Sequence, residues 1–150
     1  MDKIGNRIEN EAIRAKIVSA GEAAMLIKDG MVVATSGFTP AGYPKAVPLA
    51  LAERAKAGDK TQSTLITGAS VGPEMDTALT EAGVIKRRFP YQTNKTIRDA
   101  INKGSVEYAD MNLSQVAPMM KYGVFGDIDI AVVEAVAIDG DCNIYPSTSV

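Results

Sequence analysis

The chain has 150 residues, of which 46% are hydrophobic and 23% are charged, and it carries a net charge of −2. This length and composition are typical of one globular domain, and a charge so close to zero gives no field that would attract nucleic acid or an anionic membrane. Histidine is absent and Cys142 is the only cysteine, which excludes a Ser-His-Asp or Cys-His mechanism and an intrachain disulfide and leaves no ordinary set of zinc ligands.

The sequence shows no targeting or membrane signal. Residues 1–15 are charged and mixed, without the apolar run of a secretory leader. No stretch approaches the roughly 20 consecutive apolar residues that a membrane helix needs. We therefore expect a cytoplasmic protein that binds neither a membrane nor a metal.

Helices and strands are expected to alternate from the start of the chain. Apolar residues at helical spacing between Arg7 and Val18 predict a first helix. Ser19 stands three residues before Glu22, the spacing of a capping box, so a second helix should begin there and stop by Gly30. The next predicted elements are a strand over 31–36, a helix from Pro44 or Pro48 to Ala57, a strand over 63–67 and a helix over 75–82.

The alternation continues in the second half of the chain. The predicted elements are a strand over 84–89, a helix capped by Thr93 or Asn94 and ending at Lys103, a weak strand over 106–109, a helix over 114–122 started or interrupted by Pro118, a strong strand over 128–137, and a return strand over 143–145 after the hairpin dipeptide Asp139-Gly140. This order predicts a single α/β domain over 1–150, with a mostly parallel sheet and helices on both faces.

Three loops rich in glycine and small polar residues follow predicted strands: 36–45, 67–73 and 90–94. Ligands of open α/β sheets bind at the carboxyl ends of the strands, and a helix that follows such a loop presents free N–H groups to an anion. Simple turn formation explains any one of these loops equally well. None matches the dinucleotide fingerprint or the P-loop.

The motifs in these loops resemble the N-terminal signature of the acetyl-CoA hydrolase/transferase family. The similar segments follow one another along nearly the whole chain: 35–39, 41–45 with 47–48, 65–70 with 72–73, 90–94, 108–111, 113–114, 133–138 and 146–150. The resemblance implies a NagB/RpiA/CoA-transferase-like fold and a longer subunit of two related α/β domains. It further implies a homodimer and a nucleophilic glutamate in the second domain, so that no catalytic residue is expected before Val150.

Motif by motif, the resemblance assigns substrate-binding roles to residues of this chain. Ser70 corresponds to the active-site serine of the family and Thr93 to its pocket threonine, each donating a hydrogen bond to a substrate or nucleophile carboxylate. The wall beside them corresponds to Gly37, Phe38, Gly42, Gly68 and Ala69. Both hydroxyls could instead cap the helices that follow them, and for Thr93 the two roles are compatible.

Glu134 lies inside the apolar run 128–137, and a buried carboxylate there is a candidate for a shifted pKa and a catalytic role. Because the resemblance places the nucleophile after Val150, we interpret Glu134 as a paired structural carboxylate. Asp127 and Asp129 fit a turn before the strand, and no role is expected for Cys142. Three basic side chains could approach a CoA phosphate or a substrate carboxylate, although solvated helix faces explain them better: Lys45, Lys95 and Arg98.

Three functions are therefore weighed. The resemblance implies transfer of coenzyme A between a short-chain acyl-CoA (acetyl-, propionyl-, butyryl- or succinyl-CoA) and a small carboxylate, with the protein's own C-terminal domain as partner and no metal. An acyl-CoA hydrolase would use water as the acceptor. The third possibility, a non-catalytic domain that binds phosphate or another small molecule, is supported by fold analogy alone. As an isolated segment, the chain is expected to be inactive.

Overall fold

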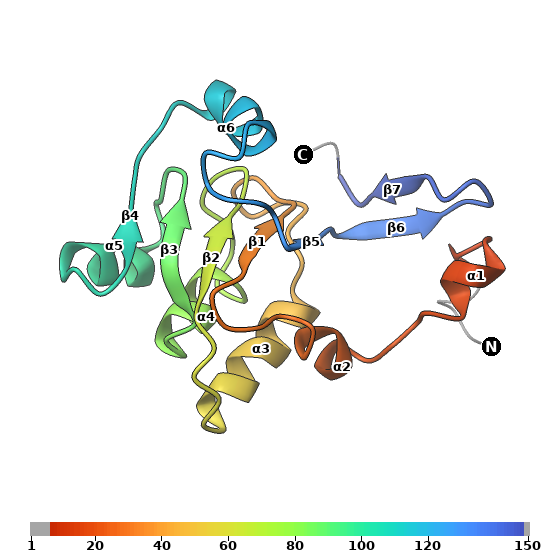
Figure 1. Cartoon of the computed structure of the whole chain (residues 1–150), viewed down its shortest axis with the longest axis horizontal. Helices are drawn as coiled ribbons and strands as arrows, with labels where there is room; N and C mark the ends of the chain where they lie inside the picture. Colours follow the sequence, from red (N-terminus) through yellow and green to blue (C-terminus); the bar gives the residue numbers. More distant parts are fainter. Residues whose placement is uncertain (1–6, 149–150) are drawn as a thin grey trace.

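The computed structural model describes residues 7–148, and a parallel sheet organises most of them (Figure 1). Within these residues the sheet has five strands in the order β4-β3-β2-β1-β5, and every pair of neighbours is parallel. Its strands are β1 (Val32–Thr35), β2 (Ser63–Ile66), β3 (Ile85–Phe89), β4 (Glu107–Tyr108) and β5 (Ile130–Val132). The predicted fold class is confirmed.

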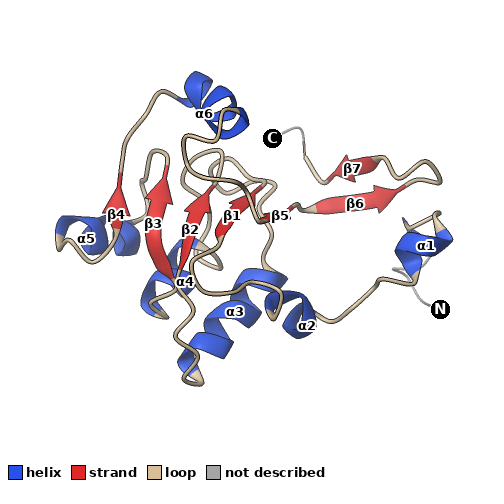
Figure 2. Ribbon diagram, in the orientation of Figure 1, coloured by secondary structure: helices blue, strands red, loops and turns tan. Residues whose placement is uncertain are grey.

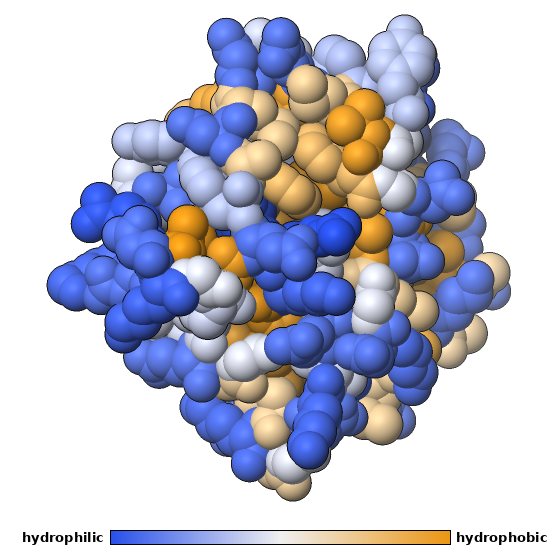
Figure 3. All heavy atoms as spheres, turned by 60° about the vertical axis from the view of Figure 1, so that its left-hand side comes forward, coloured by the Kyte–Doolittle hydropathy of each residue, from blue (hydrophilic) through white to orange (hydrophobic). Residues whose placement is uncertain are grey.

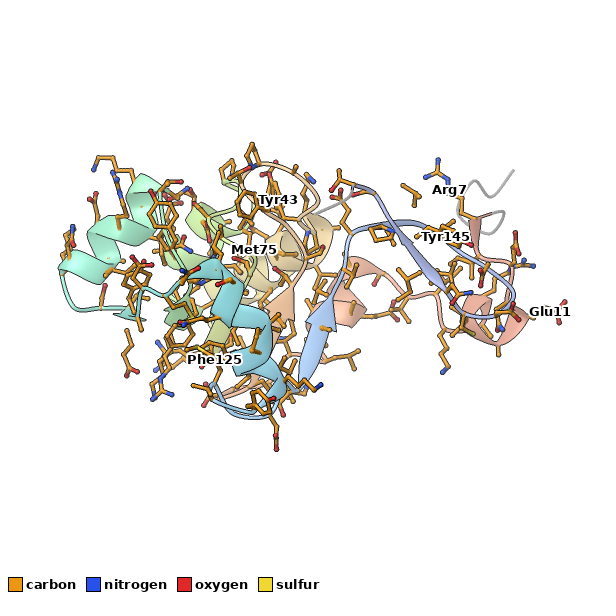
Figure 4. All side chains as sticks on the ribbon, turned by 90° about the horizontal axis from the view of Figure 1, so that it is seen from above. Arg7, Glu11, Tyr43, Met75, Phe125 and Tyr145 are labelled. Atoms are coloured by element: carbon orange, nitrogen blue, oxygen red, sulfur yellow. The ribbon has the colours of Figure 1, made fainter. Side chains whose placement is uncertain are left out.

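Helices cover both faces of this sheet (Figures 2 and 4). On one face lie α2 (Ala20–Ala24), α3 (Ala46–Lys56), α4 (Asp76–Glu81) and α5 (Lys95–Asn102), and on the other lies α6 (Leu113–Lys121). The core forms between the helices of the first face and the sheet, where Leu51, Leu79 and Ile97 pack with Val33 and Leu65. On the second face the ring of Phe125 stacks on that of Phe89, with 5.0 Å between centroids.

Local signals account for several of these elements. The capping box is present, since Ser19 Oγ accepts a hydrogen bond from Glu22 N at 3.2 Å and Glu22 Oε2 accepts one from Ser19 N at 2.9 Å. All four residues of β2 are buried, as is usual for an inner strand of a parallel sheet that is covered on both faces, although two of them, Ser63 and Thr64, are polar. Among residues 7–148, no helix is long and apolar enough to cross a membrane.

Two helices do not begin at the proline that was predicted to start them. α3 begins at Ala46, so that neither Pro44 nor Pro48 is its first residue, although Pro48 lies in the first turn. Pro118 lies inside α6 without starting or interrupting it. Pro48 fits the rule that proline is tolerated in the first turn of a helix, where its missing N–H is not needed. Pro118 lies beyond the first turn of α6, so that helix forms without the hydrogen bond that a backbone N–H would donate there.

The predicted strand over 128–137 is wrong, because the run divides into two strands of different sheets. β5 belongs to the parallel sheet, whereas β6 (Ala135–Ile138) pairs antiparallel with β7 (Ile144–Pro146), which confirms the predicted hairpin. The division follows from the length of β1. Ser36 N donates to Val132 O at 3.0 Å, but the next donor, Glu134 N, binds the Ser36 hydroxyl at 2.9 Å, which turns the chain out of the sheet.

The predicted helix between Arg7 and Val18 is also wrong in extent. Only α1 (Glu11–Arg14) forms, capped by Asn10, whose side chain accepts from Ile13 N at 3.1 Å. Ile8 instead bridges to Ile138 of β6. We call β6, β7 and residues 7–14 the arm. It projects from the sheet (Figure 1), and no residue of its helix or strands is buried.

Candidate functional site

The three loops predicted to hold a ligand leave β1, β2 and β3 at one edge of the sheet, because these strands are parallel. The loops also bond to one another. Gly68 N donates to Gly37 O at 3.1 Å, which joins the first loop to the second. Asn94 N donates to Ser70 Oγ at 3.3 Å, which joins the second loop to the third. We call this edge the rim.

Ser70 and Thr93 lie on adjoining loops of the rim in different environments. Ser70 is buried, 4% exposed, and its hydroxyl lies 3.4 Å from Asp76 Oδ2. Thr93 is exposed. Neither is the N-cap of the following helix. Met75 has that position in α4, and Asn94 caps α5 by accepting from Thr96 N at 2.9 Å. Capping therefore does not explain either hydroxyl.

An ion pair that sequence reasoning missed lies directly behind Ser70. Arg88 Nη2 and Nε donate to Asp76 Oδ1 at 2.9 and 3.0 Å, and both side chains are 0% exposed. Burial lowers the pKa of Arg88, and the negative charge of Asp76 opposes that shift. The only signal in the sequence was an acidic residue in the first turn of α4, where the helix dipole favours it.

The position of Arg88 depends on a register shift in β3. Ser63 of β2 pairs with Ile85 and Thr64 pairs with Arg87, so β3 contains one extra residue at that point. Simple alternation from the buried Ile85 would point Arg87 inward and Arg88 outward. The irregularity reverses this, and Arg87 is instead exposed and paired with Glu107 at 2.5 Å.

Tyr43 packs between the first and second loops. It is 4% exposed, and its hydroxyl donates to Glu74 Oε2 at 2.5 Å. Burial, with the hydrogen bond to Glu74, raises the pKa of Tyr43 to about 12. A Cβ on Gly72 would lie 1.9 Å from Tyr43 Oη, and one on Gly37, where φ is +116°, would lie 2.5 Å from Tyr43 Cβ. These glycines make room for a tyrosine.

The other residues assigned to the wall are in varied settings. A Cβ on Gly68 would lie 2.6 Å from Gly37 O, so this glycine too is required by loop packing. Gly42 has φ +66° and its carbonyl accepts from Ser36 Oγ at 2.6 Å. Ala69 is buried, whereas Phe38 is 40% exposed at the rim.

A hollow of about 250 Å³ opens between the rim and α6. Its lining is mostly apolar, from Thr35, Ile66, Thr67, Gly68, Leu113, Val116, Ala117 and Met120. Figure 3 shows hydrophobic side chains gathered in the upper half of the face that it displays, the half that carries α6. Within residues 7–148, no group of three or more acidic or cysteine side chains is placed to hold a metal ion.

Glu134 lies between β5 and β6 rather than within a strand, and it is paired as expected. Its Oε2 lies 2.6 Å from Lys45 Nζ, and Ser147 Oγ donates to its other oxygen. The bond from Lys45, then that from Ser147, lowers the pKa of Glu134. Lys45 also lies over the ring of Tyr43, 4.2 Å from its centroid. The pair thus joins the base of the arm to the first loop of the rim.

Each of the remaining candidates has other surroundings. Lys95 pairs with Asp99 one turn along α5 at 2.5 Å, on the solvated face of that helix. Arg98 lines a separate hollow with Gln92 and Tyr108. Asp129 Oδ2 accepts from Val32 N at 2.8 Å, which fits the predicted turn before a strand. Asp127 and Cys142 are exposed.

Comparison with protein families and with curated proteins gives one consistent result. Residues 1–150 match the model of the acetyl-CoA hydrolase/transferase N-terminal domain. A succinyl-CoA:acetate CoA-transferase of Clostridium kluyveri is 48% identical over 145 residues, which cover 96% of this chain and 27% of that protein. A propanoyl-CoA:succinate CoA transferase of Escherichia coli is 44% identical over 137 residues, 89% of this chain and 28% of that protein.

An acetyl-CoA hydrolase of Saccharomyces cerevisiae is 37% identical over 145 residues, covering 90% of this chain and 27% of that protein. The chain thus spans less than a third of the length of these relatives. Among solved structures, RipA from Yersinia pestis superposes with a TM-score of 0.59 at 22% identity, over 90% of this chain and 31% of that one. A variant of the decarboxylase AibA/AibB gives a TM-score of 0.57 at 19% identity, over 72% of this chain and 43% of that one. These two likenesses support the fold alone.

Proposed function

Because the chain belongs to the acetyl-CoA hydrolase/transferase family, we propose that it is the N-terminal domain of a longer subunit that transfers coenzyme A from a short-chain acyl-CoA to a small carboxylate. The acyl group would be acetyl, propionyl, butyryl or succinyl. The partners would be the rest of the subunit and a second subunit. The arrangement that supports this proposal is the rim, where Ser70 and the turn that holds Thr93 are joined by a hydrogen bond.

The proposed chemistry takes its nucleophile, a glutamate, from beyond residue 150. Its carboxylate oxygen attacks the thioester carbonyl and expels the CoA thiolate, which leaves an acyl-glutamyl anhydride. The thiolate then attacks the glutamyl carbonyl and releases the donor carboxylate, so that a glutamyl-CoA thioester remains. The acceptor carboxylate reverses the two steps. Such covalent catalysis divides one difficult transfer into two easier ones and needs no histidine.

In this mechanism the present chain supplies orientation. A buried hydroxyl such as that of Ser70 gives a donor whose position is fixed before the substrate arrives, and such donors stabilise charge better than mobile water does. Thr93, at the exposed border of the same rim, would bind the carboxylate from the solvent side. Both residues would orient a carboxylate without reacting.

We expect Ser70→Ala in the full-length protein to lower kcat/KM for CoA transfer about tenfold to a hundredfold, because a hydrogen bond to a charged group is worth about 1.5–3 kcal/mol. The loss of stability should be small, about 1 kcal/mol. Steady-state transfer and thermal unfolding measure the two effects. Ser105→Ala, which also removes one hydroxyl bond, to Ala100 O, is the matched control away from the rim. A Ser70→Ala variant that is clearly less stable but keeps the kcat/KM of wild type would make Ser70 structural.

Hydrolysis is the second candidate, because the relative of Saccharomyces cerevisiae is named as an acetyl-CoA hydrolase. The two activities differ in their acceptor, and exclusion of water depends on the closed site. Release of free CoA with and without added acetate or succinate separates them. A transferase requires the carboxylate and conserves the thioester, whereas a hydrolase releases free thiol in its absence.

A further inference from the structure

The Arg88–Asp76 pair is an unusual feature for the interior of a small domain. Both side chains are fully buried, and removing two charges from water costs several kcal/mol for each ion. Apolar residues of similar volume often stabilise a core as well as such a pair or better. A contribution to stability is therefore a weak explanation for its presence. What its atoms contact is more informative.

The two side chains hold the backbone on either side of Ser70. Arg88 Nη2 donates to the carbonyl of Ala69 at 3.2 Å. Asp76 Oδ2 accepts from the N–H of Val71 at 2.7 Å. One member of the pair thus fixes the peptide group before Ser70 and the other fixes the group after it, while the bonds between the two side chains fix both to each other.

The same arrangement holds the hydroxyl proton of Ser70 only by a long hydrogen bond. Ser70 Oγ accepts from Asn94 N at 3.3 Å and donates to Asp76 Oδ2 at 3.4 Å, a distance at the outer limit of a hydrogen bond. Asp76 already accepts from Val71 N and from two guanidinium nitrogens of Arg88. If the hydroxyl turned toward a substrate carboxylate, the buried charge of Asp76 would still be satisfied.

We propose that Asp76 and Arg88 are positioning residues for CoA transfer, which hold Ser70 so that its hydroxyl faces the reacting carboxylate. The inference rests on the proposed function of the rim. Neither residue touches substrate, and each acts through Ser70. Their effect on the reaction therefore depends on the Ser70 hydroxyl.

A double-mutant cycle in the full-length protein tests this dependence. Arg88→Lys keeps the charge but removes the planar fork that contacts both Asp76 and Ala69 O. It should lower kcat about tenfold when Ser70 is present and less than twofold in the Ser70→Ala background, because coupled residues are not additive. Equal losses in both backgrounds would overturn the proposal.

A second variant distinguishes a loss of positioning from a loss of folding. Asp76→Leu combined with Arg88→Met replaces the pair by apolar side chains and leaves no lone buried charge, so the protein should fold. This apolar double variant should still lose at least tenfold in kcat, with no further loss when Ser70→Ala is added. Val84→Ala is the control for lower stability. Val84 is buried in the core just before β3, at the amino ends of the strands and away from the rim, so this change should leave kcat unchanged.

The outcomes separate the two proposals. Wild-type protein that transfers no CoA contradicts the proposed function. Wild-type transfer together with full activity of the apolar double variant, or of a folded Arg88→Lys variant, contradicts the positioning role alone. An apolar double variant that fails to fold would make the pair structural and would also overturn it.

Discussion

At the scale of single residues, tight packing among three loops places strict limits on side-chain size. Tyr43 fills the space between the first and second loops, and Gly37 and Gly72 lie where any side chain would overlap it. Gly68 lies equally close to the carbonyl of Gly37. Close packing within and between the loops therefore accounts for these three glycines.

We expect Gly72→Ala to lower the free energy of unfolding by about 1–3 kcal/mol, because the new methyl group would lie 1.9 Å from Tyr43 Oη. Urea denaturation measures the change. Gly21→Ala is the matched control. Its methyl group would lie 3.9 Å from Ser19 Oγ, inside α2, and it should stabilise by about 0.5–1 kcal/mol. A Gly72→Ala variant as stable as wild type would show that Tyr43 is not wedged against this loop.

At the scale of elements, the arm and the rim are joined through few contacts. Glu134 N binds the hydroxyl of Ser36, and the Glu134 carboxylate binds Lys45. These bonds form where the chain passes from β5 into β6. The orientation of the arm therefore depends on polar groups at one turn, in contrast to the apolar packing that holds α2 to α5 against the sheet.

Glu134→Gln should lower the free energy of unfolding at pH 7 by less than about 1 kcal/mol, because the side chains of Lys45 and Glu134 are 44% and 29% exposed. The pairing with Lys45 lowers the pKa of Glu134 in the folded state. Its contribution is therefore present above the unfolded pKa of about 4.3 and is lost as the pH falls through the lower folded value.

Chemical denaturation of wild type and variant between pH 7 and pH 3 checks this. The difference in stability should shrink toward the acid end and should also fall with added salt. Glu53→Gln, in a pair where the glutamate side chain is 71% exposed, should have a smaller effect. A difference that stays constant with pH would mean that the charge of Glu134 does not matter to the fold.

At the scale of the whole molecule, the rim forms within this chain while the proposed nucleophile lies outside it. We expect residues 1–150 alone to show no CoA transfer, because they do not include the glutamate proposed as the nucleophile. Product formation from acyl-CoA and a small carboxylate is the measurement, with circular dichroism to establish folding and the full-length protein as positive control. Turnover by the segment that Glu134→Gln abolishes would make Glu134 the nucleophile.

The sequence by itself determined the features that depend on near neighbours in the chain. The capping box at Ser19, the strands β1 and β2 and the hairpin after β6 arise from local sequence patterns, and the alternation of helices and strands is enough to indicate a parallel sheet. From that order, the convergence of three loops at one edge also followed. The roles of Ser70 and Thr93 there stay predictions.

Only the tertiary structure decided how the rim is built. Arg88 is buried because β3 contains one more residue than β2 at the point where their register shifts. The run 128–137 divides because β1, its neighbour in the sheet, pairs with it only as far as Val132. Glu134 meets Lys45 across 89 residues of chain. Such contacts depend on the relative lengths and registers of distant strands, which hydrophobic spacing within one segment does not encode.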